Sequence, residues 1–191
     1  SSMDPRYEDP RGLWEALEGQ QALTIAHHCG GGPIPTNWSI PPNPVLEPLV
    51  EVASVHGVSE ALDAPGAIYS PVPGSFGRDA LDRGYTLGFM GGGDSHDGHP
   101  GLAWLASNQG GLVAVLDAEL TREGLFEALR SRRVYATNGS RTLLFTTLDG
   151  LAMGSQLEPT TRAQLVVFSV GDAPLSAVEV IRSGEIVQRI P

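Results

Sequence analysis

Residues 85–96 read Tyr-Thr-Leu-Gly-Phe-Met-Gly-Gly-Gly-Asp-Ser-His, and the fold is best interpreted outward from this stretch. Residues 85–90 form a short apolar run, which is typical of a buried strand. The three glycines that follow allow close approach and unusual backbone angles. Asp94 and His96 are two residues apart, so in an extended segment their side chains point to one face. A carboxylate and an imidazole placed in this way predict a metal site at the end of a strand.

Two earlier strand candidates also end at histidines. Residues 22–26 run into His27-His28, and residues 49–55 run into His56. In α/β barrels and open parallel sheets, catalytic residues collect at the carboxyl ends of the strands. The candidate ligands of a shared metal site are therefore Asp94 and His96, with His27, His28 and His56 as further candidates.

The first two thirds of the chain alternate between strand and helix patterns. Helices are predicted to start at Pro10, behind the capping Asp9, and to cover residues 75–83 and 121–133. A fourth strand is expected at residues 112–116. This alternation favours a parallel sheet or barrel. The proline-rich residues 33–48 are expected to form a long surface loop.

The C-terminal part has a different pattern. Four strand-like segments follow one another without a helix between them, at residues 143–148, 164–170, 177–182 and 185–190. Asp149-Gly150 and Ser183-Gly184 are suited to hairpin turns. We therefore expect two domains, an α/β unit over residues 1–139 and a small antiparallel, sandwich-like β unit over residues 140–191.

Composition excludes several classes of protein. Twelve arginines, no lysine and 22 acidic residues give a net charge of −10, which should repel nucleic acid and anionic membranes. No apolar stretch approaches the roughly 20 residues of a membrane helix. Residues 1–5 resemble no signal peptide, so a cytoplasmic bacterial protein is expected unless a signal lies upstream. The single Cys29 excludes an internal disulfide and any multi-cysteine zinc module.

Each candidate also has a purely structural interpretation. His27-His28 is equally consistent with one buried and one exposed histidine, and His56 with a turn cap. His99 is expected to face solvent. Glu51 is expected to be a buried supporting carboxylate, because strand alternation places it on the face opposite His56. Further structural interpretations are a small buried apolar group for Cys29 and a solvated helix end for the arginines at 130–133.

Three segments resemble the later metal-binding motifs of the PHP (polymerase and histidinol phosphatase) superfamily: residues 24–28, residues 50–57 and residues 93–98. The context at residues 120–123 and 135–139 is similar to an uncharacterised, domain-of-unknown-function branch of that superfamily. The resemblance implies the C-terminal strands of a distorted (βα)7 barrel, followed by the antiparallel β unit. It also implies two or three divalent ions (zinc, manganese or iron) and hydrolysis of a small phosphorylated substrate.

By motif, the resemblance makes His27, His56, Asp94 and His96 metal ligands. His27 and His56 would share one ion, while Asp94 and His96 would bind separate ions. It gives His28 and Asp97 catalytic roles, in contacting substrate or relaying a proton. The superfamily's first His-x-His motif has no counterpart here. A missing N-terminal segment, a second chain that completes the barrel, or a rearranged fold would each account for this.

The sequence therefore predicts a metal-dependent phosphoesterase site of which this chain supplies the later half. Two alternatives stay open. One is a catalytically incomplete fragment that acts as a binding or structural module. The other is an amidohydrolase-like enzyme that cleaves carbon–nitrogen bonds, because such enzymes also use histidines and a late aspartate on barrel strands.

Overall fold

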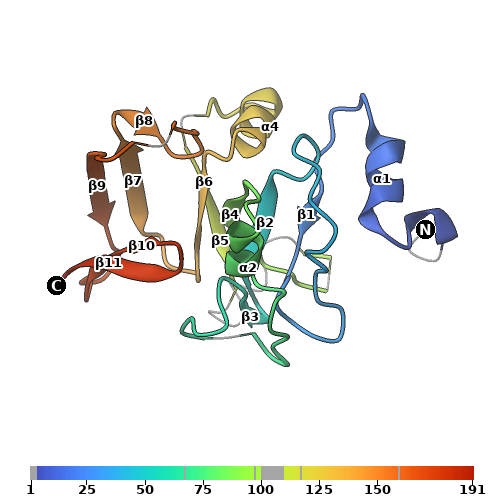
Figure 1. Ribbon diagram of the computed structural model, residues 1–191, viewed down its shortest axis with the longest axis horizontal. Helices are drawn as coiled ribbons and strands as arrows, with labels where there is room; N and C mark the ends of the chain where they lie inside the picture. Colours follow the sequence, from blue (N-terminus) through green and yellow to red (C-terminus); the bar gives the residue numbers. More distant parts are fainter. Residues whose placement is uncertain (1–3, 67, 97, 100–109, 117, 159) are drawn as a thin grey trace.

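The computed structural model describes residues 4–66, 68–96, 98–99, 110–116, 118–158 and 160–191. Its helices are η1 (Pro5–Tyr7), α1 (Pro10–Leu17), α2 (Gly77–Asp82) and α4 (Arg122–Arg130). Its strands are β1 (Ile25–Ala26), β2 (Leu49–Ser54), β3 (Gly57–Val58), β4 (Gly88–Gly91), β5 (Leu112–Val115), β6 (Val134–Thr137), β7 (Leu143–Leu148), β8 (Leu151–Ala152), β9 (Leu165–Val170), β10 (Val178–Arg182) and β11 (Glu185–Ile190). In Figure 1, β1, β2 and β4 lie side by side in the middle, with α1 towards one end and β7–β11 towards the other.

Strand β2 is the centre of the first sheet. It pairs in parallel with β1 on one edge and with β4 on the other, and its end turns back into the antiparallel β3. All six residues of β2 are buried, which explains its nearly continuous apolar sequence. The parallel pairing expected from the alternating pattern is confirmed for these three strands.

Strands β5 and β6 pair with each other in antiparallel fashion, with α4 in the connection between them. Gly92 joins this pair to the first sheet, because its N–H donates to the Ala53 carbonyl and its carbonyl accepts from Gly111 N–H, both at 2.9 Å. Helix α4 starts as predicted, with the Thr121 hydroxyl accepting from Gly124 N–H at 3.0 Å.

The main core cluster includes a residue of the proline-rich loop. Trp38 is buried with Cys29, Val50, Val52 and Ala80. Its indole N–H donates to the carbonyls of Ser75 and Phe76 at 2.9 and 3.0 Å, and its own carbonyl accepts from the Tyr85 hydroxyl at 2.9 Å. The loop was expected to lie on the surface; instead it is anchored in the core at Trp38.

The C-terminal strands form two small antiparallel sheets, β8-β7-β9 and β10-β11, so the antiparallel pairing predicted for this region is confirmed. The Tyr135 hydroxyl connects β6 to the start of β7, since it donates to the Thr142 carbonyl at 2.7 Å and accepts from Leu144 N–H at 3.0 Å. Many of their apolar side chains are exposed, including Phe145 and Phe168.

The predicted partial (βα)7 barrel is wrong. The described residues form mostly strands in small separate sheets with few helices, and no closed barrel is present among them. The pattern was misleading because the helix after β5 leads into an antiparallel partner, whereas a barrel needs a parallel one. No helix within the described ranges is long and apolar enough to cross a lipid bilayer.

We predict that Glu47→Gln stabilises the protein by about 1–2 kcal/mol at pH 8, because the variant avoids the cost of ionising a half-buried carboxyl group. The gain is smaller than the full pKa shift implies, since the carboxylate keeps some contact with water. Burial raises the pKa of Glu47 from 4.5 to about 7. Between these values the folded state keeps a proton that the unfolded state has released, so stability falls as the pH rises, and the full penalty applies above pH 7.

The measurement is urea unfolding of both proteins from pH 4 to pH 8. The advantage of the variant should disappear near pH 4. Glu15→Gln makes the same change of charge on the exposed side of α1 and should show no such pH dependence. An equal benefit from Glu47→Gln at both ends of the pH range would contradict the prediction.

Candidate metal centre

The parallel strands bring four histidines and one aspartate to the same edge of the first sheet. His27 and His28 follow β1, and His56 lies in the turn between β2 and β3. Asp94 and His96 follow β4. Because β1, β2 and β4 run in the same direction, their carboxyl ends meet. The structure thus brings together the four residues predicted as ligands and His28, which was predicted to be catalytic.

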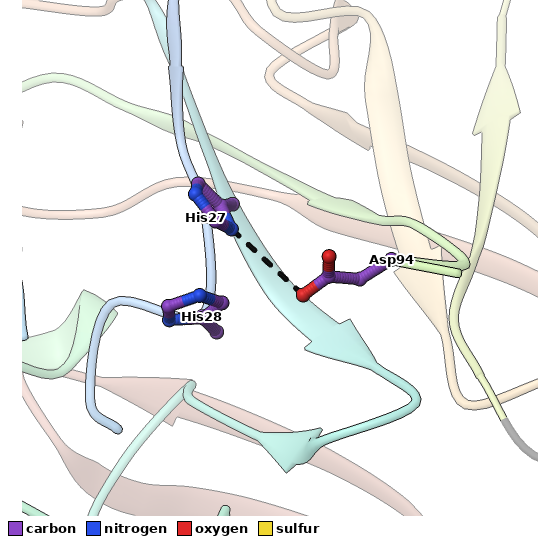
Figure 2. A group of neighbouring side chains, drawn as sticks. All are labelled: His27, His28 and Asp94. Atoms are coloured by element: carbon purple, nitrogen blue, oxygen red, sulfur yellow. Dashed lines mark ion pairs between the residues drawn. The ribbon is translucent and has the colours of Figure 1, made fainter. Parts of the chain in front are cut away.

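Asp94 lies at the centre of this cluster. One of its carboxylate oxygens, Oδ2, is 3.2 Å from His56 Nε2 and 3.8 Å from His27 Nδ1. Figure 2 shows the Asp94 and His27 side chains pointing towards each other across the end of β2. The same Oδ2 is buried, and no group in the described part of the chain donates a hydrogen bond to it. A buried carboxylate oxygen without a donor is costly, and a bound cation would remove that cost.

The backbone at the centre is held in an unfavourable conformation. His28 and Asp94 have φ angles of 34° and 45°, in the left-handed region that residues other than glycine rarely adopt. Such strain persists only where the surrounding structure enforces it, and it is commonly found at functional sites. Both strained residues carry side chains of the cluster.

The potential ligand atoms fall into two groups that share Asp94. One group is His27, His28 and Asp94, and the other is His56, Asp94 and His96. Within each group the ligand atoms lie within 4.8 Å of one another. The sequence interpretation paired His27 with His56 on one ion, whereas the structure groups His27 with His28 and His56 with His96.

The histidine rings also contact one another. The ring centroids of His27 and His28 are 4.0 Å apart, and His56 lies 5.6 Å from His28 and 5.5 Å from His96. Burial lowers the pKa of His27, and the neighbouring His28 lowers it further, against the opposing effect of Asp94. A lowered pKa keeps this imidazole neutral, which is the form that binds a metal ion.

Glu51, in β2, contacts the segments that follow both neighbouring strands, β1 and β4. It is buried in β2, and its Oε2 accepts a hydrogen bond from the His28 N–H at 3.2 Å. Its other oxygen, Oε1, lies where a side-chain carbon on Gly92 would have to be. Burial raises the pKa of Glu51, while the His28 N–H opposes the rise. Glu51 therefore fixes the backbone of the cluster and belongs to neither ligand group.

The other sequence candidates lie elsewhere. Asp97, predicted to be catalytic, lies outside the described residues. His99 is exposed and belongs to neither group. Cys29 is fully buried, its thiol lies 3.5 Å from the Ser59 carbonyl, and burial raises its pKa to about 12, so it is an inert core residue.

A cavity of about 550 Å³ adjoins the centre. His27 and His28 form part of its wall, together with Trp14, Trp38 and Glu47. These residues come from α1, the segment after β1 and the proline-rich loop, and only the folded chain brings them together. The cavity offers room for a small molecule beside the two histidines.

The comparisons with known proteins give a family match without a function. The model of a family described as "Protein of unknown function (DUF3604)" matches residues 101–149. A protein of Chlamydia muridarum is 31% identical over 158 residues, covering 73% of this chain and 25% of its own length. A protein of Chlamydia trachomatis is 30% identical over 162 residues, covering 75% of this chain and 26% of its own length.

Both relatives carry the name "Uncharacterized protein", as does a third from Chlamydia pneumoniae that is 31% identical over 163 residues. The chain spans about a quarter of the length of these curated relatives. No solved structure matches it. None of these matches carries the PHP name, so that relationship stays a proposal.

We predict that Gly92→Ala lowers the free energy of unfolding by about 1–3 kcal/mol, because the added methyl group collides with the Glu51 carboxylate. In a Glu51→Ala background the methyl group meets vacated space, so the same substitution should cost much less. Chemical denaturation of the two single variants and the double variant measures this coupling. Equal costs in both backgrounds would show that Glu51 and Gly92 do not constrain each other.

We also predict that the protein binds zinc or manganese and that Asp94→Asn weakens binding at least about tenfold, since the ligating charge is lost while the shape is kept. Isothermal titration calorimetry after dialysis against a chelator measures the affinity. His99→Ala removes an imidazole that belongs to neither group and serves as the matched control. Unchanged affinity in Asp94→Asn would remove the basis for a metal centre.

Proposed function

We propose that this chain contributes a histidine–aspartate metal centre to a metal-dependent phosphoesterase. The observation that carries the proposal is Asp94: its buried Oδ2 has no donor in the described part of the chain, and it is common to two groups of potential ligands. Two adjacent ligand groups sharing a carboxylate suit a site for two ions, the arrangement used by many phosphatases and nucleases. The resemblance to the later PHP motifs supports the same chemistry.

The donor set fits the proposed metals. Imidazole nitrogens and carboxylate oxygens suit zinc, manganese and iron, whereas calcium and magnesium prefer sites made of oxygen alone. His27, His56, Asp94 and His96 are the proposed ligands, and His28 lies beside His27 in the proposed role of contacting substrate or relaying a proton. Divalent ions bound here would supply Lewis acidity towards a phosphate and would activate water for attack.

The protein's own residues would supply orientation and proton handling. Glu51 holds the His28 backbone, and through it the His27-His28 pair, against β2. His28 is half-buried beside His27, where it can hold a proton for the leaving group. Asp97 remains the other candidate for this role from the sequence. The cavity beside His27 and His28 would accept the organic part of the substrate.

The proposal concerns a protein of the length of the relatives, in which this chain corresponds to one part. The chain spans about a quarter of their length, and the motifs that would complete a PHP-type ligand set have no counterpart in it. Further ligands contributed by other segments or by a second chain are therefore part of the proposal.

The proposal predicts that p-nitrophenyl phosphate is hydrolysed in the presence of manganese or zinc, and that Asp94→Asn lowers kcat/KM by at least about 100-fold. Loss of groups that merely support metal ligands already costs about 10–100-fold, so loss of a shared ligand should cost at least as much. Release of p-nitrophenolate, with and without added metal, is the measurement. The assay is run on this chain and on a full-length relative, and His99→Ala should retain activity.

An amide of matched size, such as an acyl p-nitroanilide, separates phosphoester chemistry from cleavage of carbon–nitrogen bonds. Hydrolysis of the anilide alone would replace the phosphoesterase proposal by an amidohydrolase-like one. Metal binding without turnover in either protein would favour a binding module. Activity that survives Asp94→Asn unchanged would exclude this centre as the source of the reaction.

A further inference from the structure

A second cavity, of about 810 Å³, lies at the other end of β4 from the metal centre. Arg132 contacts Gly88, the first residue of β4, since a side-chain carbon built on Gly88 would lie 3.0 Å from Arg132 Cβ. Asp94 follows Gly91, the last residue of the same strand. The two sites are therefore separate.

Arginines dominate the charge of this cavity. Arg130, Arg132 and Arg133 all line it, and Glu127 is the one carboxylate among its lining residues. Glu127 is fully engaged: Arg130 donates to both of its oxygens at 3.0 Å, and the Ser131 hydroxyl donates at 3.1 Å. These bonds lower the pKa of Glu127. The Glu127 carboxylate is thus paired with Arg130, and among the described residues neither Arg132 nor Arg133 forms an ion pair with it.

Arg132 and Arg133 have no carboxylate partner among the described residues. Arg132 donates to the neutral carbonyl of Gly154 at 3.1 Å. The Arg133 Nε is buried and has no hydrogen-bond acceptor in the described part of the chain. A buried guanidinium N–H without an acceptor is costly, and a ligand oxygen would remove the cost. The helix dipole explains one cation at the end of α4, but it leaves this buried donor unexplained.

The backbone at the end of α4 supports the same interpretation. Arg132 has a φ of 58°, at the position after a helix where glycine is usually found. An arginine at such a position has a strained backbone conformation, and strain of this kind often occurs at ligand sites. Gly154 lies so close to the Ser131 carbonyl that a side chain there would collide with it, so the facing loop is closely packed against the arginines.

We propose that this cavity binds a small phosphate-bearing organic molecule. Guanidinium groups bind phosphate oxygens through paired, charge-assisted hydrogen bonds. The volume exceeds what a bare phosphate needs, and Leu151 and Met153 supply apolar wall for an organic group. Long polyanions such as RNA are disfavoured because the chain as a whole carries a net charge of −10.

The test uses metal-free protein, so that phosphate has no ion to bind at the metal centre and the result is independent of the proposed enzymatic function. Inorganic phosphate is titrated at constant ionic strength while backbone amide shifts are followed by NMR. The shifts should concentrate at residues 130–133 and 151–156, and Asp94→Asn should show the same map. Shifts concentrated at residues 27–28 and 94–96, or no shifts at all, would overturn the proposal.

Variants provide the second arm. Arg133→Gln should raise the phosphate Kd at least about tenfold, equivalent to about 1.4 kcal/mol. Arg189→Gln is the matched control: this exposed arginine pairs with Glu179 on β10 and should leave the Kd within about twofold. If Arg133→Gln does not fold, Arg133→Lys keeps the charge without the paired donors and should still weaken binding. Wild-type affinity in a folded Arg133 variant would refute the proposal.

Discussion

The pairing of β2 with a parallel neighbour on each edge is the constraint on which the rest of the structure depends. Leu49 and Val50 are matched to Ile25 and Ala26 on one side and to Gly88 and Phe89 on the other. This register fixes where β1 and β4 end, and therefore where their histidines and aspartate project. Glu51 secures the same edge from within, through the His28 N–H and its contact with Gly92.

Burial explains which parts of this arrangement could be predicted from the sequence. Strand β2 was found nearly in full, because a strand covered on both faces has a continuous apolar pattern. Strands β3 and β8 are only two residues long, so their patterns were too short to detect. Strand β6 directly follows the arginine-rich end of the predicted helix, which obscured where it begins. The barrel expectation failed because periodicity indicates strands and helices but does not determine which strands pair.

The candidate site, too, could be predicted only in part from the sequence. That strand ends converge is a property of parallel sheets, so the gathering of His27, His56 and Asp94 was foreseeable. The left-handed backbone conformation at His28 and Asp94 could not be foreseen, because residues other than glycine rarely adopt a positive φ. The role of Trp38 could not be foreseen either, because the sequence of a proline-rich loop does not show which carbonyl groups will accept the tryptophan N–H. Contacts between distant segments determine such details.

Asp94 belongs to both ligand groups, and this has a thermodynamic consequence. In the proposed centre the two ions would compete for the electron density of one carboxylate and would repel each other. Occupancy of one group must then change the affinity of the other, and by reciprocity the factor is the same in both directions. Two such sites have no independent dissociation constants; the centre is described by an intrinsic affinity for each group and a single coupling free energy.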